Sequence, residues 1–418
     1  MEEKTEEIKN NNIINNGNNN IINNKEVDER KKIMSYIVKK YIQCSKKTQE
    51  ITTNILDSIM CKNKEKLKSL CEDGLPDELP ELRSLIWKIN IGYLPLDMEK
   101  WNEILKSKRA SYKLYKNYVF DNLGKELELF KDYDKMKESE KKELDKKTSK
   151  LILEEICKDT NRTHTEMSFF LRPIDKDIIF TEEEVIKLYE NKRNCNLKNI
   201  NETYKINIVL THSDIISRIL FIYSKFEPNI SYIQGMNEIL APIYYCFNLH
   251  SSDEVESVDD IEADTFYTYY ALMSKLKNLF DKNEDKKDDG INGKAKRLKE
   301  MLKIIDNILY NHLEESNFDF SILVYKWISL LFSQNYEMID VIRLWDYLLS
   351  NENIFINCYY FSLAIILMKK EELLNVDKIN NLYKIFQNIR DLNIENIIFN
   401  AKLISEKCGK KCLDILKY

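Results

Sequence analysis

The sequence predicts an all-α fold, built as one large helical domain behind a disordered leader. Its 418 residues include only eight Gly and six Pro, whereas β-rich folds use both freely at their many turns. Hydrophobic residues make up 43% of the chain and aromatic residues 11%, which is enough for a substantial core. Apolar residues recur at helical spacing, and no stretch shows the alternation that is typical of a half-buried strand.

The chain divides into four segments by composition. Residues 1–27 are rich in Asn and Ile without an amphipathic period, so we predict a disordered leader there. Residues 28–73 read as a charged, partly helical N-terminal segment. One Gly and two Pro in GLPDELP, residues 74–80, mark the start of the domain, for which we predict residues 74–350. We expect residues 351–418 to form C-terminal helices that pack on this domain.

Helical periodicity accounts for most of the domain in chain order. ELRSLIWKINIGYLP begins it, with apolar residues on one face and a stop signal at Gly92 and Pro95. SDIISRILFIYSKF has Ser213 or Asp214 as its expected N-cap. The other amphipathic or apolar stretches are WNEILKSKRASYKLYKNYVF, EADTFYTYYALMSKLKNLF, SILVYKWISLLFSQNY, MIDVIRLWDYLL and CYYFSLAIILMKKEELL. Two weaker helices close the chain.

Two polar stretches interrupt the helices. Residues 125–150 mix Lys and Glu with few apolar positions, so we expect a solvated helix or insert. Residues 281–297 are expected to be a polar loop. This loop superficially resembles a calcium-binding EF-hand, but Lys287 and Lys296 would stand where ligands belong, which excludes calcium.

Charge and cysteine usage narrow the class of protein. The net charge is −5 with both signs interspersed, and no basic stripe with aromatic interleaving occurs, so nucleic acid is not expected as a partner. The nine Cys are odd in number and fit reduced thiols. The longest apolar run, residues 359–368, is too short to span a bilayer, and the N-terminus is not a signal peptide. We therefore expect a soluble, cytoplasmic protein that reaches membranes only through partners.

Two arginine-containing motifs stand out from the helical background. Arg83 and Trp87 lie four residues apart, hence on one helical face, and an arginine along a tryptophan is common in cores. In ICKDTNR, helical spacing places Ile156, Asp159 and Arg162 on one side, so the carboxylate can hold the guanidinium in one orientation. Taken alone, a motif of this kind is more often a surface ion pair of little energetic value.

A third motif lies within SYIQGMNEILAPIYY. Tyr232-Ile-Gln234-Gly235 is either an ordinary helix entrance or a means of holding Gln234 out toward another molecule. We expect Pro242 to bend the helix that follows. The buried stripe of this helix is predicted to be Met236, Leu240, Ile243 and Phe247.

In this order the three motifs resemble the TBC domain, the Rab GTPase-activating module named after Tre-2, Bub2 and Cdc16. The resemblance runs from about Leu75 to Leu349 and includes LRSLIWKINIGYLPLD, DTNRTHTEMSFF and WISLLFSQNYEMIDVIRLWDYLL. The phrases RILFIY, QGMNEI and EADTF carry a closer match to one branch of the family. The chain departs from the family at residues 326–327, Lys-Trp for the common Arg-Trp, and at residues 334–335, Gln-Asn for Gln-Glu.

The resemblance implies a partner and a mechanism. The partner is a Rab-family small GTPase in its GTP form, whose slow hydrolysis the module stimulates in regulating vesicle trafficking. Arg162 is implied as an arginine finger and Gln234 as a glutamine finger, both supplied in trans. The chain would thus be a GTPase activator rather than a hydrolase itself. It would need no cofactor or metal of its own, because Mg²⁺ and GTP belong to the partner.

The other motif residues are implied in supporting roles. Asp159 is implied to orient Arg162, and Arg83 to lie near the site in a supporting or GTPase-contacting role. Tyr232 and Gly235 are implied to support the glutamine loop. Trp87 and Ile156 are implied to be structural.

Two alternatives from other classes stay open at this point. A catalytically inactive TBC scaffold would bind a Rab or a trafficking complex, but such modules usually lack a finger, and this chain has both. A hydrolase that acts on a small molecule finds little support, since none of the four His falls in a recognisable nucleophile–base motif.

Overall fold

The computed structural model describes most of the chain. The described residues are 28–129, 149–175, 210–249, 256–281, 283–376 and 378–416, with the backbone alone for 124–129. The predicted leader and most of the charged stretch at 125–150 lie outside them. Within the described residues helices dominate, no strand forms, and a single β-bridge joins Pro173 to Thr211, so the all-α prediction is confirmed. The predicted segment boundaries stay predictions.

Residues 28–73, the part of the N-terminal region that the structure describes, fold as three helices, the first of which packs on the long helix α6 (Trp101–Leu129). They are α2 (Glu29–Tyr41), α3 (Lys46–Met60) and α4 (Lys64–Glu72). Asp28, Ser45 and Asn63 cap them in turn, each accepting from the backbone N–H three residues later. Ile37 and Ile55 are fully buried, so these helices share the core of the domain.

The middle of the chain forms the helices that carry the motifs. They are α5 (Pro80–Ile91), η1 (Met98–Lys100), α8 (Ser149–Thr160), η3 (Ser168–Leu171), α11 (His212–Phe226), α12 (Met236–Asn248), α13 (Val258–Leu276) and η5 (Lys277–Leu279). α5 begins at Pro80 and ends at Ile91, and the cap at Gly92, with φ of 102°, confirms the predicted stop signal. The predicted cap of α11 was wrong: Thr211 is the N-cap, and Asp214 closes a capping box with it.

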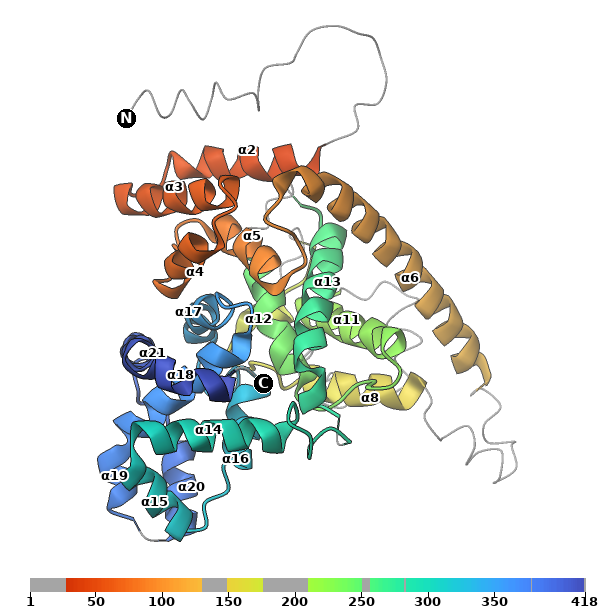
Figure 1. Ribbon diagram of the computed structural model, residues 1–418. Coiled ribbons are helices and arrows are strands. Elements are labelled where there is room, and N and C mark those ends of the chain that lie inside the picture. The colour runs from red at the N-terminus through yellow and green to blue at the C-terminus, as the bar shows by residue number, and fades with distance from the viewer. Residues whose placement is uncertain are drawn as a thin grey trace, which may run out of the picture.

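The C-terminal part forms a second group of helices. They are α14 (Ile291–Ile305), α15 (Asn307–Glu315), α16 (Ser321–Leu323), η6 (Val324–Ile328), α17 (Met338–Leu348), α18 (Ile354–Met368), α19 (Lys370–Leu374), α20 (Ile379–Gln387) and α21 (Ile394–Leu416). In Figure 1, α14, α15, α19 and α20 gather at the lower left, whereas α6 runs along the right-hand edge. α18 and α21 pack side by side, and α17 lies between them and α12.

The loop predicted at residues 281–297 ends earlier than expected, because α14 begins at Ile291. The loop before α14 folds back closely on the start of this helix. A Cβ on Gly290 would stand 1.9 Å from the carbonyl oxygen of Glu284, and one on Gly293 would stand 2.0 Å from that of Asp288. The two glycines therefore permit a close approach between loop and helix rather than flexible coil.

The apolar stretch at residues 321–336 is not the single helix that its composition predicts. α16 leads into η6, a five-residue π-helix, and turns follow it. The amide of Phe332 donates to the carbonyl of Trp327, five residues back, at 2.7 Å, and Leu331 and Phe332 have positive φ. Trp327, Leu331 and Phe332 are all buried. The π-helix and the left-handed residues thus change the course of the chain here, and all three side chains stay buried.

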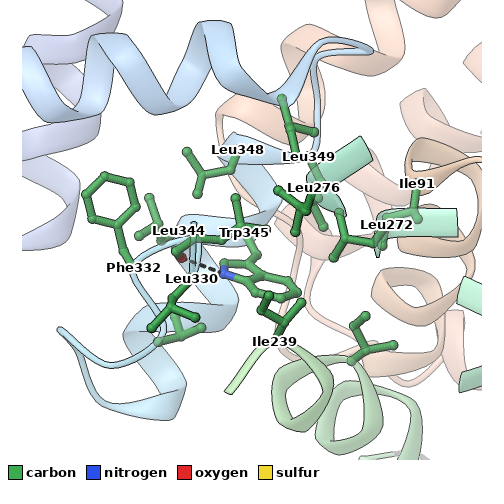
Figure 2. Close-up of a cluster of buried hydrophobic side chains, with 14 of the residues drawn as sticks. Ile91, Ile239, Leu272, Leu276, Leu330, Phe332, Leu344, Trp345, Leu348 and Leu349 are labelled. Atoms are coloured by element: carbon green, nitrogen blue, oxygen red, sulfur yellow. Dashed lines mark hydrogen bonds between the residues drawn. The ribbon is translucent and has the colours of Figure 1, made fainter. Parts of the chain in front are cut away.

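Two tryptophans mark the centre of the core. The rings of Trp87 and Trp345 lie 5.6 Å apart between α5 and α17. Figure 2 shows Trp345 among leucines and isoleucines from α12, α13 and α17, with its Nε1–H bonded to the carbonyl of Leu331 at 3.0 Å. The predicted stripe of α12 is confirmed, since all four of its residues are fully buried.

The apolar run at residues 359–368 lies in α18. Most of α18 is buried on all sides, as a central helix of a large core should be. In the ranges that the structure describes, no helix combines the length and the apolar character that a bilayer crossing requires.

Candidate functional site

The Asp159–Arg162 pair lies just past the C-terminal end of α8. Ile156 is fully buried, and the Asp159 side chain is only 5% exposed. The helix ends at Thr160, and a last turn brings the amide of Arg162 to the carbonyl of Asp159 at 3.1 Å. Nη2 of Arg162 donates to Oδ1 of Asp159 at 2.6 Å, while the arginine side chain is 58% exposed. A buried carboxylate thus holds a guanidinium that faces solvent.

The glutamine motif forms the entrance to α12, as one of the two interpretations predicted. Gly235 is the N-cap of that helix with φ of 100°, and Ser231 has φ of 59°. A Cβ on Gly235 would stand 3.1 Å from Cδ2 of Leu330. Gln234 is exposed, and its amide has no hydrogen bond within the part of the chain that is described. The left-handed residues therefore turn the glutamine outward.

Tyr232 joins the two motifs. Its hydroxyl donates to Oδ2 of Asp159 at 2.7 Å, so the two oxygens of one carboxylate hold Tyr232 and Arg162. Burial raises the pKa of Tyr232, and the bond to Asp159 raises it further, which keeps the hydroxyl a donor at neutral pH. Segments more than 70 residues apart are tied together at this point.

Behind this junction lies a layer of polar side chains that the motifs did not predict. Nδ2 of Asn237 donates to Oγ1 of Thr163 at 2.7 Å, and that hydroxyl donates to the backbone carbonyl of Asp159 at 3.0 Å. Asn237 and Thr163 are both buried. The start of α12 is therefore fastened to the turn that carries Arg162.

Glu238 extends the same layer. Its Oε1 accepts from Nδ2 of Asn237 at 3.0 Å, and its Oε2 lies 3.7 Å from Nε2 of His164. Burial raises the pKa of Glu238, an effect that His164, Asn237 and a hydrogen bond from Gln334 oppose. Two consecutive polar residues at the start of an otherwise apolar helix were the sequence signal that could have found Asn237 and Glu238.

A groove begins beside the glutamine. Tyr232 and Gln234 line a hollow of about 590 Å³ together with Glu155 of α8 and Leu330. This hollow shares lining residues, among them Tyr325, with a second one of about 1210 Å³ that extends to α20. Tyr325 is 62% exposed. The exposed amide therefore stands at one end of a long concave surface.

Arg83 and Trp87 lie elsewhere, between α5 and α17. Nε of Arg83 is 3.2 Å from both carboxylate oxygens of Asp346, and its Nη2 donates to the carbonyl of Leu75 at 2.6 Å. Nε1 of Trp87 donates to Oδ1 of Asp346 at 2.9 Å. Arg83 is only 2% exposed, and its supporting or GTPase-contacting role stays a prediction. The structure does not bring it to the Asp159 cluster, whereas Trp87 lies in the core as expected.

No group of three or more His, Cys, Asp and Glu side chains that could hold a metal ion occurs among the described residues. What the cluster at Asp159 offers chemically is one exposed cation and one exposed neutral amide. Such groups stabilise charge and orient a small molecule such as water.

Comparison with known proteins points to the family that the motifs resemble. Residues 198–374 match the family model described as the Rab-GTPase-TBC domain. TBC1 domain family member 13 of Homo sapiens is 29% identical over 379 residues, which cover 82% of this chain and 94% of that protein. The GTPase-activating protein GYP1 of Saccharomyces cerevisiae is 24% identical over 313 residues, 71% of this chain and 39% of that protein.

Two solved structures share the fold. The Ypt/Rab-GAP domain of Gyp1p superposes with a TM-score of 0.57 at 19% identity, covering 81% of this chain and 91% of that chain. The Chlamydomonas flagellar RabGAP TBC domain gives 0.51 at 16% identity, covering 92% and 97%. The resemblance to the TBC family is confirmed, including the likeness to member 13 that RILFIY, QGMNEI and EADTF carry.

Proposed function

We propose that this chain, whose residues 198–374 match the Rab-GTPase-TBC domain, is a GTPase-activating protein for a Rab-family small GTPase. It stimulates the hydrolysis of GTP that is bound to the Rab, and it thereby regulates membrane trafficking. The relatives named Rab-GAP and GTPase-activating protein support this role in general terms. The residues of the Asp159 cluster support a specific mechanism.

In this mechanism Arg162 enters the nucleotide site of the GTPase. Negative charge spreads over the transferring phosphoryl group in the transition state, and a guanidinium inserted by a partner typically accelerates the reaction by a factor on the order of 10³ to 10⁵. A planar guanidinium can bridge oxygens of two phosphates, which an ammonium cannot do equally well. Asp159 acts as a positioning residue, because it holds the arginine without reaching the nucleotide.

Gln234 supplies the second group. Its amide can accept a hydrogen bond from the attacking water and donate one to an oxygen of the γ-phosphate, with no added charge. Gly235 supports this group, because it adopts the left-handed turn before α12 and leaves room for Leu330 beside Gln234. The observation that carries the proposal is the Asp159 carboxylate, which accepts from Arg162 through one oxygen and from Tyr232, two residues before Gln234, through the other.

The proposal assigns the bond-breaking site to the partner. The GTPase contributes GTP and Mg²⁺, and this chain contributes side chains in trans without a cofactor of its own. Contact with endomembranes is indirect, through the membrane-attached Rab.

A GTP-hydrolysis screen tests the proposal. Purified protein is mixed with each member of a Rab panel preloaded with GTP, and phosphate release is followed. At least one Rab is expected to respond. Arg162→Ala and Gln234→Ala are each expected to lower the stimulated rate with that Rab by a factor on the order of 10² or more, at an unchanged melting temperature.

Matched controls come from the N-terminal helices. Arg30 and Gln43 lie on and just after α2, far from α8 in Figure 1, so Arg30→Ala and Gln43→Ala should leave the stimulated rate within about twofold. The proposal is falsified if both finger variants stimulate as the parent does. A chain that binds a GTP-loaded Rab without stimulating it would instead be a scaffold.

A further inference from the structure

A pocket distinct from the groove lies between α13, α14 and α18. Its volume is about 280 Å³, and it shares no lining residue with the groove beside Gln234. Volumes near 300 Å³ are at the small end of ligand pockets, so only a compact ligand would fit. The side chains that define it are Lys275, Asn278, Lys294, Arg297, Phe355 and Tyr359.

Lys294 is the central feature of this pocket. The residue is only 5% exposed, and its Nζ lies 3.5 Å from the centroid of the Phe355 ring. No hydrogen bond or ion pair of Nζ occurs with any residue that the structure describes. Burial lowers the pKa of Lys294 to about 8, with Asp289 opposing the shift, so the ammonium is still charged at pH 7. A buried ammonium with three unused donors lines the cavity.

Two further cations line the same cavity. Arg297 is 8% exposed and donates through Nη1 to the backbone carbonyl of Asp288. It also bonds the hydroxyl of Tyr359, which accepts from the arginine and so keeps its own O–H as a donor. Lys275, half-buried, has its pKa lowered by burial. Against these three cations the lining contains one carboxylate, Asp289.

The helix N-termini beside the pocket carry partial positive charge, as the three cations do. The first turns of α14 and α18 supply lining residues, and neither contains an acidic residue. The positive end of each helix dipole therefore adds to the field of the three cations.

Lys88, another buried lysine, is paired with carboxylates and serves as a comparison. The Lys88 side chain is 3% exposed, and its Nζ lies 3.0 Å from Glu256 and 2.7 Å from Asp264. Buried charges in proteins are normally paired in this way, because an unpaired one is costly. Lys294 is equally buried and lacks such a partner. This difference points to an anion that none of the described residues supplies.

We propose that the pocket formed by Lys275, Lys294, Arg297 and Tyr359 binds the phosphate group of a small phosphate monoester. Arginine and lysine side chains that line one small cavity suit a dianionic phosphate, and charge-assisted hydrogen bonds are the strong ones. The phosphate belongs either to a soluble molecule or to the headgroup of a phosphorylated lipid, because both present the same chemistry at the pocket.

The test uses the full chain and two kinds of probe. Calorimetry measures binding of inorganic phosphate and of inositol 1,4,5-trisphosphate. Flotation measures binding to phosphatidylcholine vesicles with and without 5% phosphatidylinositol 4-phosphate. Lys294→Met is expected to weaken binding of the responding probe at least about tenfold, and Lys275→Met less. Lys296→Met is the matched control: it removes the same charge from α14 at an exposed side chain and should change affinity less than about twofold.

Thermal unfolding separates binding from folding. The responding soluble probe should raise the melting temperature of the parent and of Lys296→Met, but not that of Lys294→Met, which should itself melt no lower than the parent because it removes an unpaired buried charge. Vesicle binding that depends on the phosphorylated lipid identifies a headgroup, and binding of the soluble probes alone identifies a soluble ligand. The proposal is overturned if the parent binds none of the probes, or if Lys294→Met and Lys275→Met both bind as the parent does.

Discussion

Two of the arginine–aspartate pairs among the described residues differ sharply, one in the core and one at the surface. In the core, the side chains of Arg83 and Asp346 are 3% and 0% exposed and lie 3.2 Å apart. At the surface, Arg162 is 58% exposed, while its partner Asp159 is 5% exposed and 2.6 Å away. Both carboxylates are buried, so the difference between the pairs lies in the arginine.

That difference decides what each arginine can do. The Arg83 guanidinium donates to the buried Asp346 and to the carbonyl of Leu75, and its Nη2 also lies 2.7 Å from the exposed Asp77. Moving Arg83 would deprive Asp346 and the carbonyl of Leu75 of a hydrogen bond in the core. Arg83 therefore fastens α5 to α17. Arg162 has one edge on Asp159 and the rest in solvent. Its carboxylate is held in place by Tyr232, so the exposed guanidinium is oriented without being enclosed.

The same substitution in both pairs tests this distinction, and its largest effect is expected at Arg162. Arg162→Lys keeps the charge but loses the fork that bridges two phosphates, so the stimulated rate of GTP hydrolysis should fall by a factor on the order of 10³. The free energy of unfolding should change by less than about 0.5 kcal/mol, because an exposed ion pair contributes little. Phosphate release and urea denaturation measure the two quantities. A variant that retains a third of the parental rate would count against the finger role.

At Arg83 the same change should act on stability. Arg83→Lys cannot reach both Asp346 and the carbonyl of Leu75, so the free energy of unfolding in urea should fall by about 2–3 kcal/mol. The activity of each folded molecule should stay within about twofold of the parent. Arg30→Lys, which changes an ion pair with Glu99 at the surface, is the control and should change stability by less than about 1 kcal/mol. Equal effects of the two changes would remove the distinction between buried and exposed pairs.

The contrast also shows what the sequence could predict. Helix positions and the stop at Gly92 follow from local periodicity and local residue preferences, and the structure confirms them. The link between Asp159 and Arg162 is also local, since three residues separate them. Asp346 is 263 residues from Arg83, so no local pattern shows that this arginine has a buried partner.

The predictions that failed depend on packing between distant segments. The apolar residues at 321–336 fit a helix by composition, but the chain forms a π-helix and left-handed turns there, with Trp327 and Phe332 both buried. Asn237 and Glu238 are polar residues on an apolar helix, which marks them as unusual. Their partners on the Arg162 turn become visible only when α8 and α12 are in place.

The third prediction concerns Asp159, which holds Arg162 in place. Asp159→Asn keeps the shape and can still accept from Tyr232, but it loses the charge-assisted bond to the arginine. The stimulated rate should therefore fall about tenfold. In an Arg162→Ala background the same change should have less than about a twofold effect, because a positioning residue acts only through the group that it positions. Additive effects in this double-mutant cycle would show that Asp159 contributes by another route.

The smallest effect is expected at the glutamine loop, where two glycines form a natural pair. Gly92 and Gly235 have φ of 102° and 100°, so Gly→Ala imposes the same backbone strain, about 1–2 kcal/mol of unfolding free energy. A Cβ at Gly92 meets nothing within 4 Å, whereas one at Gly235 stands 3.1 Å from Leu330, beside Gln234. Both variants should lose similar stability in urea, but only Gly235→Ala should also lower stimulated hydrolysis, by roughly threefold to tenfold. If Gly92→Ala lowered the rate equally, the loss would reflect general destabilisation, and the close approach at Gly235 would have no special part in orienting the glutamine.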